Sequence, residues 1–403
     1  MPLNIEKQMK AQLSDEILNA LKLCSQTADE HNFKIYLIGG IVRDLLLKRK
    51  SLDIDVTVEG DAIKFCHLLA GKKYCKILQV QNELKTAKVV FDGEVEIDFA
   101  STRQEFYPHR GHLPVVVKIG CSLQEDVYRR DFTINSLAMS LNKKNYGDVI
   151  DYVGGIKDLN NKKIRVLHDN SFNEDPSRIL RALKFAARFN FHRDAHTKAL
   201  QEKYINTQMH EDISWARIKS EFKQCFSLNS AKVYDMFIVN ENYKLIYGQK
   251  PELKGLEIKT LVDKYNPYHV WLVYLGTVLT NPKIIEQFCF TRSEKKIFSD
   301  IEYLMNNHLS VMNTNFDIYK FFARRTTESI LVYYLLTQRK EALKYLENLS
   351  LIRVELNGDE LKEMGITNGR EIGEILEEIL KRKLNGSIVK KSDEIEFVKN
   401  KIK

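Results

Sequence analysis

The sequence predicts an α+β protein, in which an N-terminal part with a mixed sheet precedes an all-helical remainder. Over about the first 150 residues, short runs of β-forming residues alternate with segments of helical spacing. From residue 173 onward the helical pattern dominates, and the chain of 403 residues has only seven prolines. A chain of this length has room for two or three domains.

The predicted elements of the first third alternate between the two kinds. They are a polar helix over about residues 6–30, the strand FKIYLIGG (33–40), a helix from IVRDLLLKRK (41–50), the strand LDIDVTV (52–58), a helix around 61–71, and the strands KKYCKILQV (72–80), TAKVVF (86–91) and EVEIDFA (94–100). Asp-Gly between the last two strands is a strong hairpin signal. Residues 101–125 carry Pro, Gly and His without a clear period, which predicts a long loop.

Composition narrows the class of protein. Hydrophobic residues make up 44% and charged residues 29%, as in soluble globular proteins. There is no apolar run of transmembrane length, and the first residues carry charges where a signal peptide needs an apolar core. We therefore expect a cytoplasmic protein with no membrane contact. Six scattered cysteines without a CxxC pair predict reduced thiols. The net charge of +8 suits a polyanionic partner, but a biased genome composition explains it equally well.

Two acids in the stretch SLDIDVTVEG (51–60) raise a chemical question. In a strand, Asp53 and Asp55 project to the same face, while Leu52, Ile54 and Val56 face the core. Two close carboxylates repel each other unless a cation lies between them or one is protonated. Mg²⁺, a hard ion that prefers oxygen ligands, resolves the conflict and serves phosphoryl chemistry. The alternative is a solvated strand face that happens to carry two acids.

A third acid is predicted from the next strand. In EVEIDFAS, Glu96 and Asp98 share one face, and Asp98 is the better candidate because Glu96 lies nearer the turn. Before the acids, the strand–turn–helix pattern IYLIGGIVRDLLL places Gly39 and Gly40 where backbone can approach a phosphate, at a helix N-terminus. Arg43 can add a charged fork to a triphosphate.

At this point the sequence resembles a known family. The string GGIVRDLLLKRKSLDIDV is similar to the signature of class II tRNA nucleotidyltransferases (CCA-adding enzymes) and bacterial poly(A) polymerases. Further blocks follow in the family's order: YRRDFTINSLAMSL (128–141), DYVGGIKDLNNKKIRVL (151–167), EDPSRILRALKFAARFNF (174–191) and the weaker ISWARIKSEFKQCF (213–226). The last block usually has Glu where Ala216 stands here.

The resemblance implies a domain architecture and roles for individual residues. We expect a polymerase β-like nucleotidyltransferase head (1–150), a helical neck with the nucleotide-selecting block (151–228), a helical body (229–345) and a helical tRNA-binding tail (346–403). It also implies that Arg129, Arg130, Asp131, Asn135 and Arg181 hold the ribose and phosphates of the nucleotide. Without the resemblance, the cluster from Arg129 to Asn135 would be interpreted as a capping cluster before SLAMSL, which has the pattern of an apolar helix.

Base selection has a direct chemical interpretation. An aspartate accepts a hydrogen bond from an exocyclic amino group, and an arginine donates to a ring nitrogen or carbonyl. Asp175 and Arg178 could thus select C and A, which both present an amino group beside an acceptor, without a template. Glu174 is positioned to orient Arg178. The alternative is an ordinary Arg-rich amphipathic helix with an aspartate cap.

Two further segments bear on which family member this is. The loop after Asp98 is long and retains Arg103, Glu105 and Tyr107, which by resemblance switch the pocket from C to A, so CC-only addition is disfavoured. The C-terminal stretch LNGDELKEMGITNGREIGEIL (356–376) and the basic LKRKLNGSIVKK (380–391) resemble the family's tRNA-gripping tail. Its expected contacts are Gly365, Gly369, Lys381, Arg382 and Lys383, and the alternative is a surface helical hairpin.

We therefore expect a template-independent enzyme that adds A, and C in the full CCA-adding form, to the 3′ end of tRNA. The expected cofactor is Mg²⁺, the nucleotides are ATP and, in the full form, CTP, and the contacts are to the acceptor stem and elbow. A poly(A) polymerase is the alternative within the family, and a non-catalytic RNA-binding protein is the alternative outside it. The sequence leaves open the oligomeric state and a separate CC-adding enzyme, and no protein partner is inferred.

Overall fold

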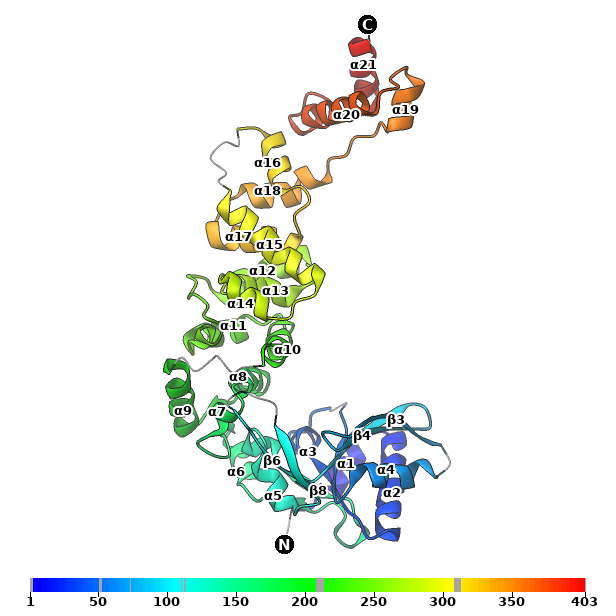
Figure 1. The fold of residues 1–403 in the computed structure, drawn as a ribbon, viewed down its shortest axis with the longest axis vertical. Helices are drawn as coiled ribbons and strands as arrows, with labels where there is room; N and C mark the ends of the chain where they lie inside the picture. Colours follow the sequence, from blue (N-terminus) through cyan, green and yellow to red (C-terminus); the bar gives the residue numbers. More distant parts are fainter. Residues whose placement is uncertain are drawn as a thin grey trace. The chain divides into compact units, whose positions relative to one another are not determined.

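The computed structural model describes residues 3–50, 53–72, 74–109, 111, 114–207, 214–307 and 313–402. The chain forms two compact units, Met1–Glu221 and Phe222–Lys403, which are described separately (Figure 1). The predicted α+β class is confirmed, because the sheet lies in the first unit and the described part of the second is helical. The division between the units falls close to the predicted boundary at residue 228. The boundaries at 150 and 345 stay predictions.

A seven-stranded mixed sheet is the framework of the first unit. Its order is β3–β4–β5–β2–β1–β8–β9, with β2 and β5 parallel and the other neighbours antiparallel. The strands are β1 (Lys34–Ile38), β2 (Asp55–Glu59), β3 (Cys75–Gln81), β4 (Thr86–Phe91), β5 (Val95–Ser101), β8 (Ala138–Ser140) and β9 (Val149–Ile150). Asp-Gly connects β4 to β5 as predicted. The parallel pair matters most, because it brings two predicted acidic positions side by side.

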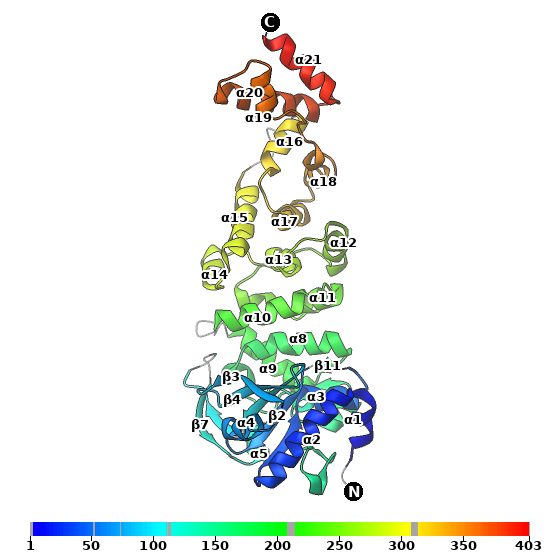
Figure 2. The ribbon, with the colours of Figure 1, turned by 90° about the vertical axis from the view of Figure 1, so that its right-hand side faces the viewer.

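Helices near the N-terminus pack against this sheet (Figure 2). They are α2 (Asp15–Glu30), α3 (Gly40–Leu46) and α4 (Ala62–Ala70), and α1 (Glu6–Gln12) packs on α3. Phe65 of α4 is fully buried, with its ring centroid 5.4 Å from that of Phe33 and 5.7 Å from that of Phe99. The predicted single helix over 6–30 is wrong in one respect. The chain is extended at Leu13 and Ser14, so two helices form.

In two segments of the first unit, the structure differs more strongly from the prediction. Residues 101–125 are not a long loop, since β6 (Arg103–Phe106) pairs antiparallel with β7 (Val115–Ile119) and α5 (Leu123–Tyr128) follows. The predicted apolar helix SLAMSL is also wrong. A short 3₁₀ turn, Thr133–Asn135, leads instead into β8, which pairs with β1 and β9 in the buried part of the sheet.

The rest of the first unit is mainly helical. It contains α6 (Gly155–Asn160), β10 (Lys163–Ile164), α7 (Ser171–Glu174), α8 (Ser177–Phe189), β11 (His192–Arg193) and α9 (Ala195–Asn206), and α10 (Trp215–Phe226) continues past its end. Asp151 accepts hydrogen bonds from the N–H groups of Gly155 and Ile156, both at 2.9 Å, and so caps α6. The block DYVGGIKDLNNKKIRVL (151–167) therefore has a structural role around Gly154.

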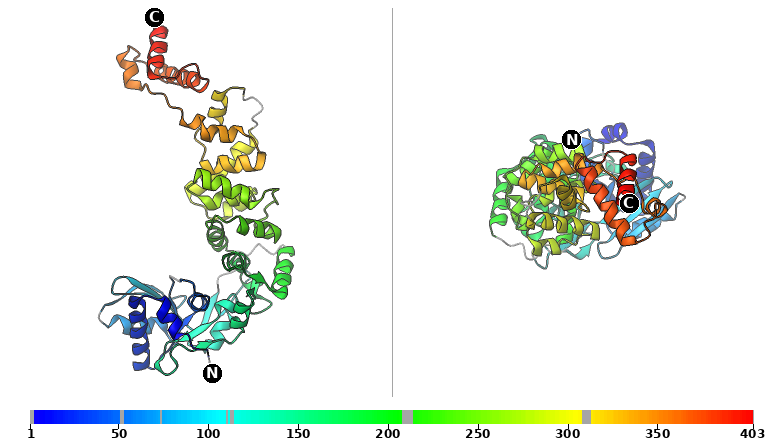
Figure 3. Two further views of the ribbon diagram at one scale, coloured as in Figure 1. Left: turned by 180° about the vertical axis from the view of Figure 1, so that it is seen from behind. Right: turned by 90° about the horizontal axis from the view of Figure 1, so that it is seen from above.

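The second unit, in its described residues, consists of helices (Figure 3). These are α11 (Ala231–Val239), α12 (Gly255–Tyr265), α13 (Val270–Gly276), α14 (Pro282–Gln287), α15 (Arg292–Asn306), α16 (Asn315–Phe322), α17 (Thr327–Thr337), α18 (Glu341–Glu347), α19 (Gly358–Glu363), α20 (Gly369–Leu384) and α21 (Lys391–Ile402). None of the helices in the described part of the chain combines the length and the apolar character that crossing a bilayer requires.

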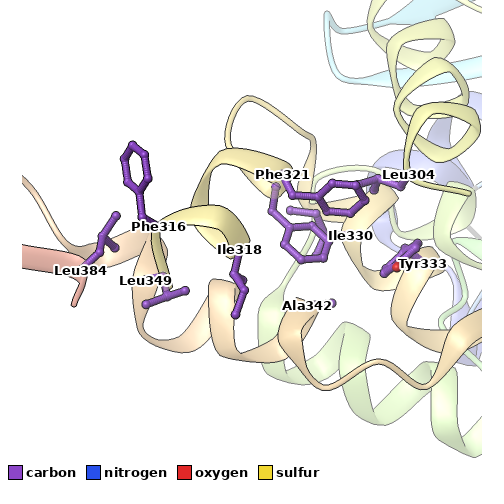
Figure 4. Close-up of a cluster of buried hydrophobic side chains, with 10 residues drawn as sticks. Leu304, Phe316, Ile318, Phe321, Ile330, Tyr333, Ala342, Leu349 and Leu384 are labelled. Atoms are coloured by element: carbon purple, nitrogen blue, oxygen red, sulfur yellow. The ribbon is translucent and has the colours of Figure 1, made fainter. Parts of the chain in front are cut away.

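Two apolar clusters lie in the second unit. One joins α15 to α18 through buried side chains such as Phe321, Phe322 and Tyr333, and Leu384 at the end of α20 reaches it beside Phe316 (Figure 4). The other is a separate core for α19, α20 and α21. It consists of Leu356, Leu361, Ile366, Ile372, Ile375, Ile379 and Val398. The tail is therefore helical, as predicted, and has its own core.

Candidate active site

The predicted acids meet on the parallel strand pair. Asp55 begins β2 and is the direct partner of Asp98 in β5, and both side chains are exposed. The Asp98 N–H donates to the Ile54 carbonyl at 3.0 Å, which extends the pairing toward Asp53. Asp53 itself lies just before the strand, not within it as predicted. Ile54 and Val56 are buried as expected, and Leu52 lies outside the described residues.

The electrostatics of these acids favour a cation. Partial desolvation raises the pKa of Asp55; the Arg130 guanidinium opposes this, and the charges of Asp98 and Asp53 raise the pKa further. Lys88, the register partner of Asp98 on β4, places Nζ 3.3 Å from an Asp98 carboxylate oxygen. Among the described residues, no three His, Cys, Asp or Glu side chains are grouped closely enough to ligate one ion as they stand. The all-oxygen donor set nevertheless fits a hard divalent cation.

The glycine turn lies against the second predicted block. Gly39 has a φ of +74°, which favours glycine, and its N–H donates to the Leu137 carbonyl at 2.9 Å. A Cβ at Gly39 would come within 3.3 Å of the Asn135 carbonyl oxygen and 3.7 Å of Arg130 Nη1. The turn therefore touches residues that the sequence predicts to hold the nucleotide.

Arg43 is buried beneath this turn. Its side chain is 5% exposed, and its Nε lies 2.9 Å from Asp44 Oδ1. Its Nη1 donates to the Asn135 side-chain oxygen, and its guanidinium lies 4.5 Å from the Phe189 ring centroid. In this arrangement Arg43 braces Asn135. A direct contact with a triphosphate stays a prediction.

Asp131 is the centre of a buried charge network. Both Nε and Nη2 of Arg181 donate to Asp131 Oδ2, at 2.9 and 2.7 Å, and Asn135 donates to Oδ1 at 3.1 Å. Burial opposes ionisation, but Arg181 outweighs it and the pKa of Asp131 is lowered. Arg181 also reaches Glu221 at 3.3 Å, and Lys184 reaches the same carboxylate at 2.9 Å. Sequence reasoning missed Glu221, although it lies in the last family-like block.

Asp126 was also missed. Its side chain has no exposed surface, and it accepts from Arg129 Nε at 2.9 Å, Arg130 Nη2 at 3.1 Å and the Arg103 N–H at 3.0 Å. Burial works against its charge, but Arg130 and Arg129 lower its pKa overall. The sequence carried a usable signal, because Asp126 precedes the two arginines by three and four residues, the spacing of neighbours on a helix.

The predicted switch loop and the base-selecting block are joined. Arg103 Nε donates to Glu105 at 3.0 Å, and Arg129 Nη1 reaches the same carboxylate at 3.5 Å. The Tyr107 hydroxyl donates to Glu105 at 3.4 Å and accepts from Arg178 Nη2 at 3.4 Å. Burial raises the pKa of Tyr107 to about 12, so its hydroxyl keeps the proton that it donates. The structure thus brings these five predicted residues into one network.

The base-selecting residues are anchored at the start of α8. Asp175 Oδ1 accepts from the Ser177 N–H at 3.0 Å, and its other oxygen pairs with Arg217 and lies 3.9 Å from Arg178 Nε. Arg178 is buried, donates to Ser171 Oγ at 2.7 Å and lies 3.8 Å from Glu174. Arg217, the residue after Ala216, was not predicted.

A pocket of about 700 Å³ opens beside this network. It is bounded on one side by the end of β6 and the residues that follow it, and on the other by α7 and the residue before it. Its walls are formed by Glu105, Phe106, Tyr107, Pro108, His109, Asn170, Asn173 and Glu174. Predicted switch and selecting residues therefore line one cavity.

The predicted tail contacts fall into two groups. Gly365 has a φ of +102°, and a Cβ at Gly365 or Gly369 would meet no atom within 4 Å, so backbone is accessible there. The prediction that Lys383 contacts RNA is wrong, because its side chain is 8% exposed and its Nζ binds Glu355 at 2.9 Å and also Glu394. Lys383 therefore stabilises the tail from within and is not available to an RNA phosphate.

Lys381 and Arg382 differ from Lys383. Arg382 is half-exposed, pairs with Glu378 at 3.0 Å and lies 4.6 Å from the Phe397 ring centroid. Lys381 is exposed, 6.0 Å from the Phe316 ring centroid. Both can still reach a phosphate, and their role in RNA binding stays a prediction.

Comparisons with known proteins agree with this geometry. Residues 35–165 match the family model described as the poly A polymerase head domain. The chain is 31% identical to an A-adding tRNA nucleotidyltransferase of Geobacter sulfurreducens, over 93% of this chain and 46% of the relative. It is 28% identical to an A-adding tRNA nucleotidyltransferase of Halalkalibacterium halodurans, over 98% of this chain and 95% of the relative.

Solved structures extend the likeness to the whole fold. The Thermotoga maritima CCA-adding enzyme complexed with tRNA superposes with a TM-score of 0.79 at 26% identity, covering 100% of this chain and 99% of that one. The chain spans about half the length of the first curated relatives it matches, at 46% and 45%. The resemblance seen in the sequence blocks is confirmed: the chain belongs to the tRNA nucleotidyltransferase/poly(A) polymerase family, in its class II branch.

Proposed function

We propose that this chain is a template-independent nucleotidyltransferase that adds A from ATP to the 3′ end of tRNA. The observation that carries the proposal is the direct pairing of Asp55 with Asp98, close in space to Arg130 and the Gly39 turn. The names of the relatives, A-adding and CCA-adding enzymes, support the substrate. A tRNA substrate would place the activity in the cytoplasm.

Asp53, Asp55 and Asp98 would hold a divalent cation, which we take to be Mg²⁺. When bound, it would supply positive charge to the reacting phosphate and the leaving pyrophosphate. The raised pKa of Asp55 supports this, since uncompensated carboxylates are costly at this position. Lys88 would have to release Asp98, to which it lies within 3.3 Å.

The remaining residues would bind and orient the nucleotide. Arg129 and Arg130, aligned by Asp126, would face the phosphates, and Asp131 with Asn135 would contact the ribose. Asp175 would accept from the amino group of adenine while Arg178 donates to its ring nitrogen. The link from Tyr107 to Arg178 would let the loop after β5 adjust this pair.

The decisive assay offers three tRNAs, ending before the first C, after C and after CC, with ATP or CTP. Incorporation of ATP alone, and only on the CC-ended tRNA, identifies an A-adding enzyme. Incorporation of CTP on the shorter tRNAs identifies full CCA addition, and long A tails on unrelated RNA identify a poly(A) polymerase. Binding of tRNA without any incorporation would favour a non-catalytic RNA-binding protein.

The acidic residues have their own test. We expect Asp53→Ala and Asp55→Asn to abolish incorporation while leaving tRNA affinity nearly unchanged, because they act on the reacting phosphate and not on the RNA grip. Glu94→Gln, an exposed acid in the turn between β4 and β5, is the matched control and should keep full activity. Retained activity in either aspartate variant would reject the metal assignment.

A further inference from the structure

An exposed basic surface lies at the end of α3 and includes none of the residues assigned above. Lys48, Arg49 and Lys50, which follow α3, and Arg188, near the end of α8, form it, and all four are exposed. We call it the α3-end surface. Its members come from segments well separated in the sequence, so the fold gathers them.

Local backbone geometry builds this surface. Lys48 has a φ of +56°, its N–H donates to the Leu45 carbonyl at 3.2 Å, and the Arg49 N–H donates to the Asp44 carbonyl at 2.8 Å. This left-handed turn ends α3 and directs Arg49 onto α8, where its Nη1 donates to the Arg188 carbonyl at 3.2 Å. Arg49 is therefore held in place by backbone contacts at both ends.

Stacking on one ring holds two guanidinium groups together. The Arg49 and Arg188 guanidinium carbons lie 5.1 and 5.3 Å from the Phe189 ring centroid. Phe189 is buried, so the ring is a fixed support. Planar guanidiniums that contact one fixed ring are suited to bind phosphate oxygens through paired hydrogen bonds.

The positive charge of the surface is poorly compensated from within. Among the described residues, no carboxylate forms an ion pair with Lys48, Arg49 or Lys50. Arg188 lies 3.8 Å from Asp44, but that carboxylate is buried and makes its closer contact, 2.9 Å, with Arg43. Like charges gathered in this way repel each other, and an external anion would remove the repulsion.

The position of the α3-end surface favours backbone phosphates of RNA as the anion. The α3 helix is seven residues long, which corresponds to roughly 10 Å between the Gly39 turn and this surface. Lys50 precedes Asp53 by three positions in the sequence, so their Cα atoms lie at most about 11 Å apart. An RNA strand whose 3′ end reaches Asp55 and Asp98 would therefore have backbone phosphates near this surface. A nucleotide triphosphate at the Gly39 turn would lie at the opposite end of α3.

We propose that the α3-end surface binds backbone phosphates of the RNA substrate just upstream of its 3′ end. This inference rests on the proposed function, which supplies the RNA and the direction of its 3′ end. Its chemistry is independent of the metal site, because it needs only charge and stacked guanidiniums.

The test compares two double variants that remove the same charge. Arg49→Gln/Lys50→Gln changes the surface, and Lys22→Gln/Lys144→Gln changes two exposed lysines on α2 and the turn before β9. Binding of CC-ended tRNA is measured by fluorescence anisotropy at several salt concentrations, without nucleotide. We expect the surface variant to weaken binding at least fivefold and to lower the slope of log Kd against log salt by about 1.5, since each lost phosphate contact contributes roughly 0.7 to 0.9.

Several outcomes would overturn the inference. One is a surface variant whose RNA affinity and salt slope match those of the control variant. Another is an unchanged RNA affinity with a raised KM for ATP, which would assign the surface to the triphosphate. Because the binding assay needs no turnover, a wild-type protein that binds tRNA but incorporates nothing would reject the proposed function and still test this surface. Equal melting temperatures of the two variants show that both are folded.

Discussion

At the scale of single residues, the candidate site is organised by two buried aspartates, Asp131 and Asp126. Asp131 was predicted and Asp126 was not, yet each neutralises arginines that the resemblance assigns to the nucleotide. Buried charges of this kind are costly when one partner is removed, because the remaining ion has no water to solvate it. Their first role is therefore to fix arginine geometry.

Asp126 gives a stability prediction. Asp126→Ala leaves Arg129 and Arg130 without their shared buried acceptor, and we expect it to lower the free energy of unfolding by about 3–5 kcal/mol. Urea denaturation followed by circular dichroism measures the change. Glu94→Ala, which removes an exposed carboxylate, should shift stability by less than about 0.5 kcal/mol. A loss for Asp126→Ala no larger than that of the control would show that the arginines find other partners.

Asp131 gives a pH prediction. Its pKa is lowered in the folded protein, so the folded state keeps the carboxylate charged at a pH where the unfolded chain begins to bind a proton. Its contribution to stability is therefore complete above the unfolded pKa of about 3.9 and is lost as the pH falls through the lower folded value. Asp131→Asn should lose less stability than wild type between about pH 5 and 3. Urea midpoints across that range measure it, and parallel curves for the two proteins would contradict it.

At the scale of elements, most of the sheet could be predicted, and the errors have physical causes. The strands β1, β4 and β5 were predicted within one or two residues. The apolar positions of β4 and β5 alternate, and β1 is an apolar run that ends at a glycine pair. The hairpin of β6 and β7 was missed because β6 turns Arg103 and Glu105 inward as an ion pair, 11% and 3% exposed. A strand with charged inward positions has no hydrophobic alternation from which to predict it.

Two other elements show what the sequence pattern can and cannot predict. The pattern of SLAMSL predicts a helix, yet β8 lies inside the sheet with its residues buried on both faces. A short run that is apolar throughout does not reveal its period, so a buried strand and a helix have the same sequence pattern. The break between α1 and α2 did have a signal, because Ser14 followed by Asp15 and Glu16 is typical of a helix start.

In the candidate site, too, the sequence pattern predicts some residues, whereas the positions of others depend on how the chain packs. Asp55 and Asp98 could be predicted because strand periodicity and a hard cation's preferences agree on them. Arg217 and Glu221 could not be assigned a role, since only the folded chain brings α10 to Asp175 and to Arg181 of α8. Lys383 was misjudged because its partner Glu394 lies on the next helix, and charge in a basic run does not show which lysine turns inward.

At the scale of the whole molecule, the predicted chemistry and the predicted RNA grip lie in different compact units. The residues predicted to bind the nucleotide belong to Met1–Glu221, whereas the predicted tail contacts Gly365, Gly369, Lys381 and Arg382 belong to Phe222–Lys403. The tail has a separate apolar core, so its stability can be changed locally. If it grips the tRNA elbow, as the family resemblance implies, substrate length should be sensed there and not at the acids.

The last prediction separates the two tasks. Ile375 is 1% exposed in the tail core, and Ile375→Ala should destabilise that core by about 2–5 kcal/mol. We expect the variant to raise KM for full-length CC-ended tRNA several-fold, with little change for an acceptor-stem RNA that lacks the elbow or for ATP. Steady-state incorporation measures all three, and Glu396→Gln, on the exposed side of α21, is the control. Equal increases for the long and the short RNA would contradict a tail that binds the elbow, because a loss confined to the tail leaves the acceptor-stem contacts in place.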